Sequence, residues 1–278
     1  MKKLEMSINT GIGDNIIVRV FFDVIKHNYD QIIVSHNKDV IEFSNNGDPN
    51  YLNFLNELGN TLFTTPPYIF SNVQYKPLFL YDTIKELNIL PSKPNLDSVL
   101  CAGTSLNLGE EYIVITTKIR GLRRKDFYPF SINLWKILRK LSEKYKIVIL
   151  GERQVENNKE YANISDIVYS IYEQIITNLP SHRIVDLTVP SLGVTTPDLK
   201  KIKQDCLIMK ESKCIVTLAI GGNLWLALSV ANVIGFKYDC GIVNNYINDM
   251  VSCLTNPKFS TAFITYDWHQ FIKKIGSI

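Results

Sequence analysis

Several common classes of protein are disfavoured by what this sequence lacks. Its five cysteines are dispersed and form no Cys-x-x-Cys pair, and its four histidines are scattered, so neither set has the spacing of metal ligands. A formal net charge of +3 is too small for a protein that wraps a polyanion such as nucleic acid. The longest apolar run, residues 224–234, is well short of the roughly 20 residues that a membrane span needs.

These absences predict the setting in which the protein works. An odd number of dispersed cysteines is typical of free thiols in a reducing compartment, so we expect a cytoplasmic protein. We expect no bound metal, no nucleic-acid partner and no transmembrane segment. The sequence also contains no Walker loop, no Gly-x-Ser-x-Gly elbow and no Gly-x-Gly-x-x-Gly turn after its first strand-like run. P-loop NTPases, typical serine hydrolases and ordinary dinucleotide oxidoreductases are therefore disfavoured.

Strand-like and helix-like patterns alternate along most of the chain. Such alternation predicts an α/β protein whose parallel sheets are joined by crossover helices. The expected strands are residues 4–8, 31–35, 62–65, 112–116, 146–150, 184–187 and 214–219, and the expected helices include 15–28, one capped by Thr196, 223–234 and 268–275. A region rich in proline, between residues 66 and 109, interrupts the alternation. We therefore predict two domains, with the final helix packing back toward the first.

The most informative motif is Gly11-Ile12-Gly13-Asp14, which lies between the first predicted strand and the first predicted helix. Glycines let the backbone approach a ligand closely, and a helix start offers free N–H donors. A carboxylate held there, that of Asp14, can accept a proton from a bound hydroxyl. The alternative is that Asp14 only caps the helix and favours its dipole.

Three further candidate sites also follow predicted strands. Parallel sheets bind ligands outside the carboxyl ends of their strands, which favours a role in binding. A basic loop after residues 112–116 carries side chains that suit the oxygens of a diphosphate: Lys118, Arg120, Arg123 and Arg124. Gly221, Gly222 and Asn223 form a turn into an apolar helix, and Glu152 follows the strand at 146–150, where it can accept hydrogen bonds from ribose hydroxyls. The alternatives are a solvated loop, an empty tight turn and an ordinary surface turn.

The order of these motifs resembles the heptosyltransferase-like glycosyltransferases, glycosyltransferase family 9, which have the GT-B fold. The resemblance implies two Rossmann-like α/β domains whose parallel sheets face a cleft. Residues 1–108 would form the acceptor-side domain and residues 109–278 the domain that binds a nucleotide-sugar. The family usually has an Asp-Ser/Thr-Gly turn and a His on the following helix, whereas this chain has Ile220, Gly221, Gly222 and Trp225 at those positions.

The resemblance also implies an activity. The protein would transfer a sugar from a nucleotide-diphosphate sugar to an acceptor hydroxyl, with inversion and without a metal. Asp14 would be the general base, and the basic loop and the turn at Gly221 would stabilise the departing diphosphate. The nucleotide-sugar would be a co-substrate rather than a cofactor, and the acceptor a glycan, a lipid-linked molecule or a protein. Two alternatives remain open: an inactive GT-B-like binding or assembly module, which the missing Asp and His favour, and a nucleotide-sugar epimerase.

Overall fold

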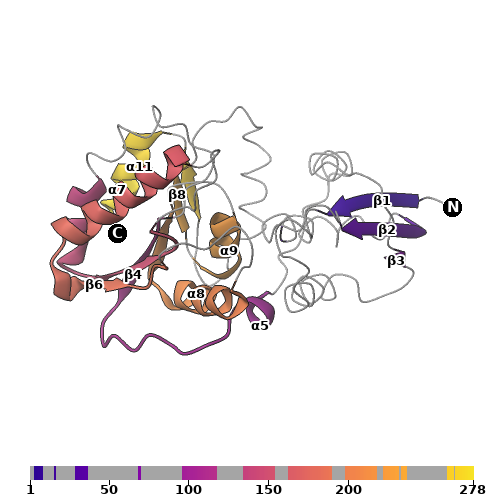
Figure 1. The fold of residues 1–278 in the computed structure, drawn as a ribbon, viewed down its shortest axis with the longest axis horizontal. Helices are drawn as coiled ribbons and strands as arrows, with labels where there is room; N and C mark the ends of the chain where they lie inside the picture. Colours follow the sequence, from indigo (N-terminus) through magenta and orange to yellow (C-terminus); the bar gives the residue numbers. More distant parts are fainter. Residues whose placement is uncertain are drawn as a thin grey trace.

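The structure is a computed structural model of the 278-residue chain. It describes residues 3–8, 16, 29–36, 68–69, 96–117, 134–153, 162–189, 198–217, 222–231, 233–236, 262–265 and 267–278. The strands of these residues form two separate sheets, which Figure 1 shows.

The smaller sheet is formed by the N-terminal part of the chain. Its strands lie in the order β1-β2-β3 and are parallel. They are β1 (Lys3–Ile8), β2 (Gln31–His36) and β3 (Tyr68–Ile69). The first two confirm the strands expected at residues 4–8 and 31–35, and β3 was not predicted. Ile16 is helical and fully buried, and the rest of the helix predicted over residues 15–28 lies outside the described residues.

The larger sheet contains six parallel strands in the order β6-β5-β4-β7-β8-β9. They are β4 (Tyr112–Thr116), β5 (Lys146–Leu150), β6 (Ile184–Asp186), β7 (Cys214–Thr217), β8 (Val233–Phe236) and β9 (Phe263–Thr265). Two all-parallel sheets with intervening helices confirm the predicted α/β class. A parallel sheet of this kind is buried on both faces, which explains why β4 and β5 are continuous apolar runs rather than alternating ones.

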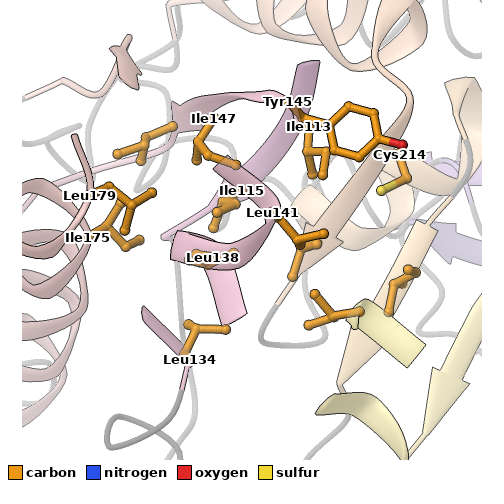
Figure 2. Close-up of a cluster of buried hydrophobic side chains, with 14 of the residues drawn as sticks. Ile113, Ile115, Leu134, Leu138, Leu141, Tyr145, Ile147, Ile175, Leu179 and Cys214 are labelled. Atoms are coloured by element: carbon orange, nitrogen blue, oxygen red, sulfur yellow. The ribbon is translucent and has the colours of Figure 1, made fainter. Parts of the chain in front are cut away.

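Helices cover both faces of the larger sheet. One face packs against helical residues 134–142, against α7 (Ala162–Asn178) and against α11 (Trp268–Ile275). Figure 2 shows this cluster, with Leu138 and Leu141 beside Ile115 of β4. On the other face, α9 (Gly222–Val230) contacts β7 and β8, and packs with α8 (Leu199–Glu211) and α5 (Asp97–Leu100). The Tyr112 hydroxyl, which donates to the carbonyl of Ile208 at 2.9 Å, ties α8 to β4.

Two sequence predictions about these helices were wrong. Residues 223–234 are not one helix, because α9 ends at Val230 and residues 233–236 form β8. A run that is apolar all round has no periodicity, so the pattern could not separate a buried helix from a buried strand. The cap of α8 is Asp198, whose side chain accepts a hydrogen bond from the Lys201 N–H, and not Thr196. The final helix, α11, packs against β8 and β9, and the prediction that it also packs back toward the first domain stays a prediction.

The segment before β4 also packs on the body of the larger sheet. Leu96 and Leu100 are buried, and the Ala102 N–H donates to the carbonyl of Lys203 in α8 at 3.3 Å. The Thr104 N–H donates to Gln204 Oε1 at 2.8 Å, and Gln204 returns a hydrogen bond to the Thr104 carbonyl. The last residues of the predicted segment 1–108 therefore contact α8, which covers the larger sheet, and the division at residue 108/109 stays a prediction.

Candidate functional site

The described strands of the larger sheet place a topological switch point between β4 and β7. From β4 the chain runs outward through β5 to β6, then returns to β7 and continues outward through β8 and β9. Counted along the chain, the strands lie in the order 3-2-1-4-5-6, the order of the Rossmann nucleotide-binding folds. Open sheets of this order bind ligands outside the carboxyl ends of the strands at the switch point. We call the ends of β4 and β7, with Thr116, Thr117 and Thr217, the switch-point edge.

Two threonines end the strands on either side of this point. Thr116 and Thr217 are register partners on adjacent parallel strands, and both are buried. They continue the alternation of Val114 and Ile215, so they lie on the sheet face that α9 covers. In the part of the chain that the structure describes, nothing forms a hydrogen bond with Thr116 Oγ1. A buried hydroxyl in that state requires an explanation, and a bound ligand or water is one.

Thr117 anchors the turn that follows β5. Its Oγ1 donates to the carbonyl of Glu152 at 2.8 Å, and its N–H donates to the carbonyl of Leu150 at 3.0 Å. Gly151 has a φ of 113°, which a residue with a Cβ rarely adopts and which lets the chain turn at the end of β5. The Glu152 side chain is fully buried. The end of β5 is therefore held against the end of β4.

A charged network lies one strand further out, where β5 and β6 end. Arg153 donates from Nη2 to Asp186 Oδ2 at 3.2 Å and from Nε to Thr188 Oγ1 at 2.8 Å. Asp186 also accepts hydrogen bonds from the Tyr172 hydroxyl at 2.7 Å and from the N–H and hydroxyl of Thr188 at 3.0 and 2.6 Å. Burial opposes ionisation of Asp186, but the hydrogen bonds from Thr188 and Tyr172 and the charge of Arg153 outweigh it, so its pKa lies below the usual value. Asp186 is therefore an ionised acceptor at neutral pH.

The structure describes only part of the candidate site that the sequence predicts. Most of those residues lie outside the described ranges: Gly11, Gly13, Asp14, Lys118, Arg120, Arg123, Arg124 and Gly221. Gly222 is the first residue of α9 and Asn223 the second. Glu152 is described and buried. The ends of β4, β5 and β7 meet at one edge, so the chain segments that carry the basic loop, Glu152 and Gly222 all leave the sheet there. The roles of these residues stay predictions.

Sequence reasoning missed the threonines at the switch point and the partners of Arg153. The available signal was weak: a hydroxyl residue at the last position of two apolar strands, Thr116 and Thr217, and a carboxylate at the end of a third, Asp186. Tyr172 gave no signal, because α7 as a whole was not predicted. Only the sheet order shows that these positions share an edge.

Among the residues that the structure describes, no three His, Cys, Asp or Glu side chains gather closely enough to hold a metal ion. The helices of those ranges include none with the length and apolar character needed to cross a bilayer.

Several solved structures are similar to this chain at low identity and low TM-score. No protein-family model matches the chain, and no curated protein matches it by sequence. Among solved structures, the chain is similar to the ADP-heptose LPS heptosyltransferase II of E. coli, with 12% identity and a TM-score of 0.45 over 100% of this chain and 98% of that one. It is also similar to the iron-containing dodecameric glycosyltransferase TibC of enterotoxigenic E. coli, with 11% identity and a TM-score of 0.43.

The TibC alignment covers 85% of this chain, which spans 58% of the length of TibC. A third solved structure, MnaA of S. aureus with UDP, is similar at 13% identity and a TM-score of 0.37, over 86% of this chain and 80% of that one. None of the three assigns a role to a residue of this chain.

Proposed function

We propose that the protein transfers a sugar from a nucleotide-diphosphate sugar to an acceptor hydroxyl, with inversion and without a metal ion. The observation that carries the proposal is the switch point between β4 and β7, because a parallel sheet with this strand order binds nucleotides at that place. The buried, unsatisfied hydroxyl of Thr116 at the same edge supports it, since it offers a ligand a hydrogen-bond partner.

In this proposal the diphosphate lies at the switch-point edge. The backbone N–H groups that open α9, at Gly222 and Asn223, carry the positive end of the helix dipole and suit an anion. Four cationic side chains follow β4 in the sequence and would stabilise the charge that grows on the leaving group: Lys118, Arg120, Arg123 and Arg124. Fixed cations of this kind perform the task that a divalent metal performs in other transferases.

The acceptor would be activated from the N-terminal half of the chain. Asp14 follows β1 in the sequence, and its carboxylate would take the proton from the attacking acceptor hydroxyl. A single displacement of the nucleotide diphosphate by that hydroxyl forms one glycosidic bond as it breaks the other, so the configuration at the sugar carbon inverts. The acceptor class, whether a glycan, a lipid-linked molecule or a protein, is open in this proposal.

A binding module without transferase activity is the second candidate. The sequence favours it at one place, because Ile220 and Trp225 stand where the resembling family has its Asp and His. Such a module would bind the nucleotide but turn over no sugar. A nucleotide-sugar epimerase would instead change the sugar without needing an acceptor.

Calorimetric titration with UDP, ADP and GDP tests whether the site binds a nucleotide. We expect one of the three to bind, and we expect Thr116→Val and Thr217→Val to weaken that binding. Thr177→Val is the matched control, since Thr177 is exposed on α7. Its hydroxyl donates to the carbonyl of Glu173 and accepts from Asn178 Nδ2, both on the same helix. Full affinity in both strand-end variants would remove the switch-point edge from the site.

Product analysis then separates the candidates. Labelled nucleotide-sugars are incubated with the protein, with and without a panel of glycan and lipid acceptors. Label transferred to an acceptor supports the transferase, a changed sugar still linked to its nucleotide supports the epimerase, and binding without a product supports the module.

A further inference from the structure

Arg153 lies outside the switch point, in the segment that follows β5. Its backbone is fixed because the chain after β5 pairs with the chain after β6, through the isolated bridge between Glu152 and Val189. The Val189 N–H donates to the carbonyl of Gly151 at 3.0 Å, and the Arg153 N–H donates to the carbonyl of Val189 at 2.9 Å. The parallel pairing of β5 and β6 is thus prolonged as far as Arg153.

Its side chain is held by β6, by the segment after β6 and by α7. The Arg153 Nε and Nη2 donate to Thr188 Oγ1 and Asp186 Oδ2, and the guanidinium Cζ lies 5.3 Å from the centroid of the Tyr172 ring on α7. Tyr172 in turn donates its hydroxyl to Asp186. Burial and that hydrogen bond raise the pKa of Tyr172, so the phenol keeps the proton that it donates. The plane of the guanidinium is therefore set before any ligand arrives.

This fixed guanidinium has N–H groups that its contacts with Thr188 and Asp186 do not use. A guanidinium has five N–H groups in a planar fork, and the contacts with Thr188 and Asp186 use the edge formed by Nε and Nη2. The side chain is 39% exposed, although it is immobilised. Arg183 offers a contrast at the opposite, amino-terminal edge of the sheet, where its side chain is only 16% exposed and bonds to Glu110 and to the carbonyl of Ser142.

The position of Arg153 defines what it can reach. β5 is the neighbour of β4 on the side away from β7, and it is the second strand of the sheet in chain order. Adjacent strands lie about 4.8 Å apart, so a ligand whose phosphates occupy the switch point reaches the end of β5 with its nucleoside. In Rossmann folds a residue at the end of the second strand contacts the ribose, and it is usually a carboxylate that accepts from the hydroxyls.

Here two charged residues follow the strand, Glu152 and Arg153. The Glu152 side chain is fully buried, and the next residue, Arg153, is the exposed one. A guanidinium is a donor only, so it binds the ribose oxygens as acceptors rather than the ribose hydroxyls as donors. We propose that Arg153 binds the ribose 2′ and 3′ oxygens of the nucleotide and that Asp186 and Tyr172 are positioning residues that orient its guanidinium. This role rests on the proposed function.

The test compares ribonucleotides with their 2′-deoxy forms. UDP, ADP and GDP and their deoxy counterparts are titrated by calorimetry into the full-length protein and into Arg153→Met. We expect the wild type to bind its ribonucleotide about tenfold or more tightly than the deoxy form, as for a hydrogen bond to a charged group. We expect the ratio to fall close to one in Arg153→Met. Arg183→Met, the matched control, should keep the wild-type ratio.

The outcomes separate this role from the function on which it rests. If the wild type binds none of the three ribonucleotides, the proposed function fails and the role fails with it. If the wild type binds one of them but shows no preference over the deoxy form, or if Arg153→Met keeps the preference, only the role of Arg153 is overturned. Should Arg153→Met not fold, Asp186→Asn and Tyr172→Phe keep the guanidinium but loosen it, and an unchanged ratio in both would overturn the role.

Discussion

Two adjacent threonines, Thr116 and Thr117, differ in their hydrogen bonding although both are buried at the end of β4. Thr117 Oγ1 donates to the carbonyl of Glu152, whereas in the described structure Thr116 Oγ1 has no partner. An unsatisfied buried hydroxyl costs about 1–3 kcal/mol, because its hydration is lost and nothing replaces it. Such a group lowers the stability of the folded protein. Groups that lower stability in this way are found most often at functional sites.

We expect Thr116→Val to raise the free energy of unfolding of the ligand-free protein by about 1 kcal/mol, since valine has nearly the same shape and no polar group. Thr117→Val should lower it by about as much, because it leaves the Glu152 carbonyl without its donor. Urea denaturation of the two variants measures both. A destabilised Thr116→Val variant would contradict the view that its hydroxyl lacks a partner in the folded protein.

The pH dependence of stability should report the network around Asp186. Its folded pKa is lowered, so the stability that it contributes is present above its unfolded pKa of about 3.9 and is lost as pH falls through the folded value. We therefore expect wild type and Asp186→Asn to differ in free energy of unfolding at pH 7 and to converge below about pH 4. Glu143→Gln, at an exposed position, serves as the control. A difference that is constant from pH 7 to pH 3 would contradict an ionised Asp186.

For Asp14, replacement by asparagine should affect turnover far more than binding. Removal of a general base typically lowers the rate by about two to four powers of ten. The nucleotide is expected on the larger sheet, and asparagine can still cap a helix, so its affinity should stay close to that of the wild type. Initial-rate kinetics and a nucleotide titration of the same variant separate the two effects. Normal turnover would mean that Asp14 is only a cap.

At the scale of elements, the sequence predicted the strands better than the helices. The runs at 112–116 and 146–150 match β4 and β5 to the residue, because a continuous β-branched stretch between turns has few alternatives. α7 was missed, although Ile171 and Ile175 mark its buried face, and β8 was absorbed into a helix. The strand order and the register of Thr116 with Thr217 depend on long-range pairing, which no local pattern contains.

The helix α11 shows that a sequence can predict the bounds of an element without predicting what it packs against. Its bounds, Trp268–Ile275, were predicted, and Asp267 caps it by accepting from the N–H groups of His269 and Gln270 at 2.8 and 3.2 Å. Amphipathicity says that one face is buried but not against what. Phe271 and Ile275 lie in the cluster of the larger sheet, and the Tyr145 hydroxyl donates to the carbonyl of Ile278 at 3.3 Å.

Truncation of Phe271 should show that α11 is part of this core. The side chain is fully buried, so Phe271→Ala is expected to lower the free energy of unfolding by about 3–5 kcal/mol. Gln270→Ala, one position earlier on the exposed side of the same helix, should change it by less than about 0.5 kcal/mol. Guanidinium denaturation compares the two. Equal effects would mean that α11 does not hold the larger sheet together.

At the scale of the whole molecule, we propose that the nucleotide binds to the larger sheet and the acceptor to the N-terminal half. The larger sheet supplies the strand order and the edge that a nucleotide needs. The smaller sheet supplies β1, which precedes the Gly11–Asp14 turn in the sequence. Transfer between these halves is what distinguishes the proposed enzyme from a nucleotide-binding module.

Chelation should leave any transferase activity unchanged. The charge on the departing diphosphate is assigned to Lys118, Arg120, Arg123 and Arg124, and fixed cations need no divalent ion to complement a diphosphate. The assay is product formation before and after treatment with EDTA. Activity that disappears and returns with manganese or magnesium would contradict the metal-independent mechanism.

Nuclear magnetic resonance of methyl-labelled threonine tests the central claim most directly, because it reports both whether a nucleotide binds and where. Spectra are recorded while UDP, ADP and GDP are titrated into the full-length protein. We predict that one of the three shifts the Thr116 and Thr217 signals saturably, while the signal of exposed Thr177 on α7 stays in place. Saturable binding that moves neither Thr116 nor Thr217, or no binding by any of the three, would contradict the account.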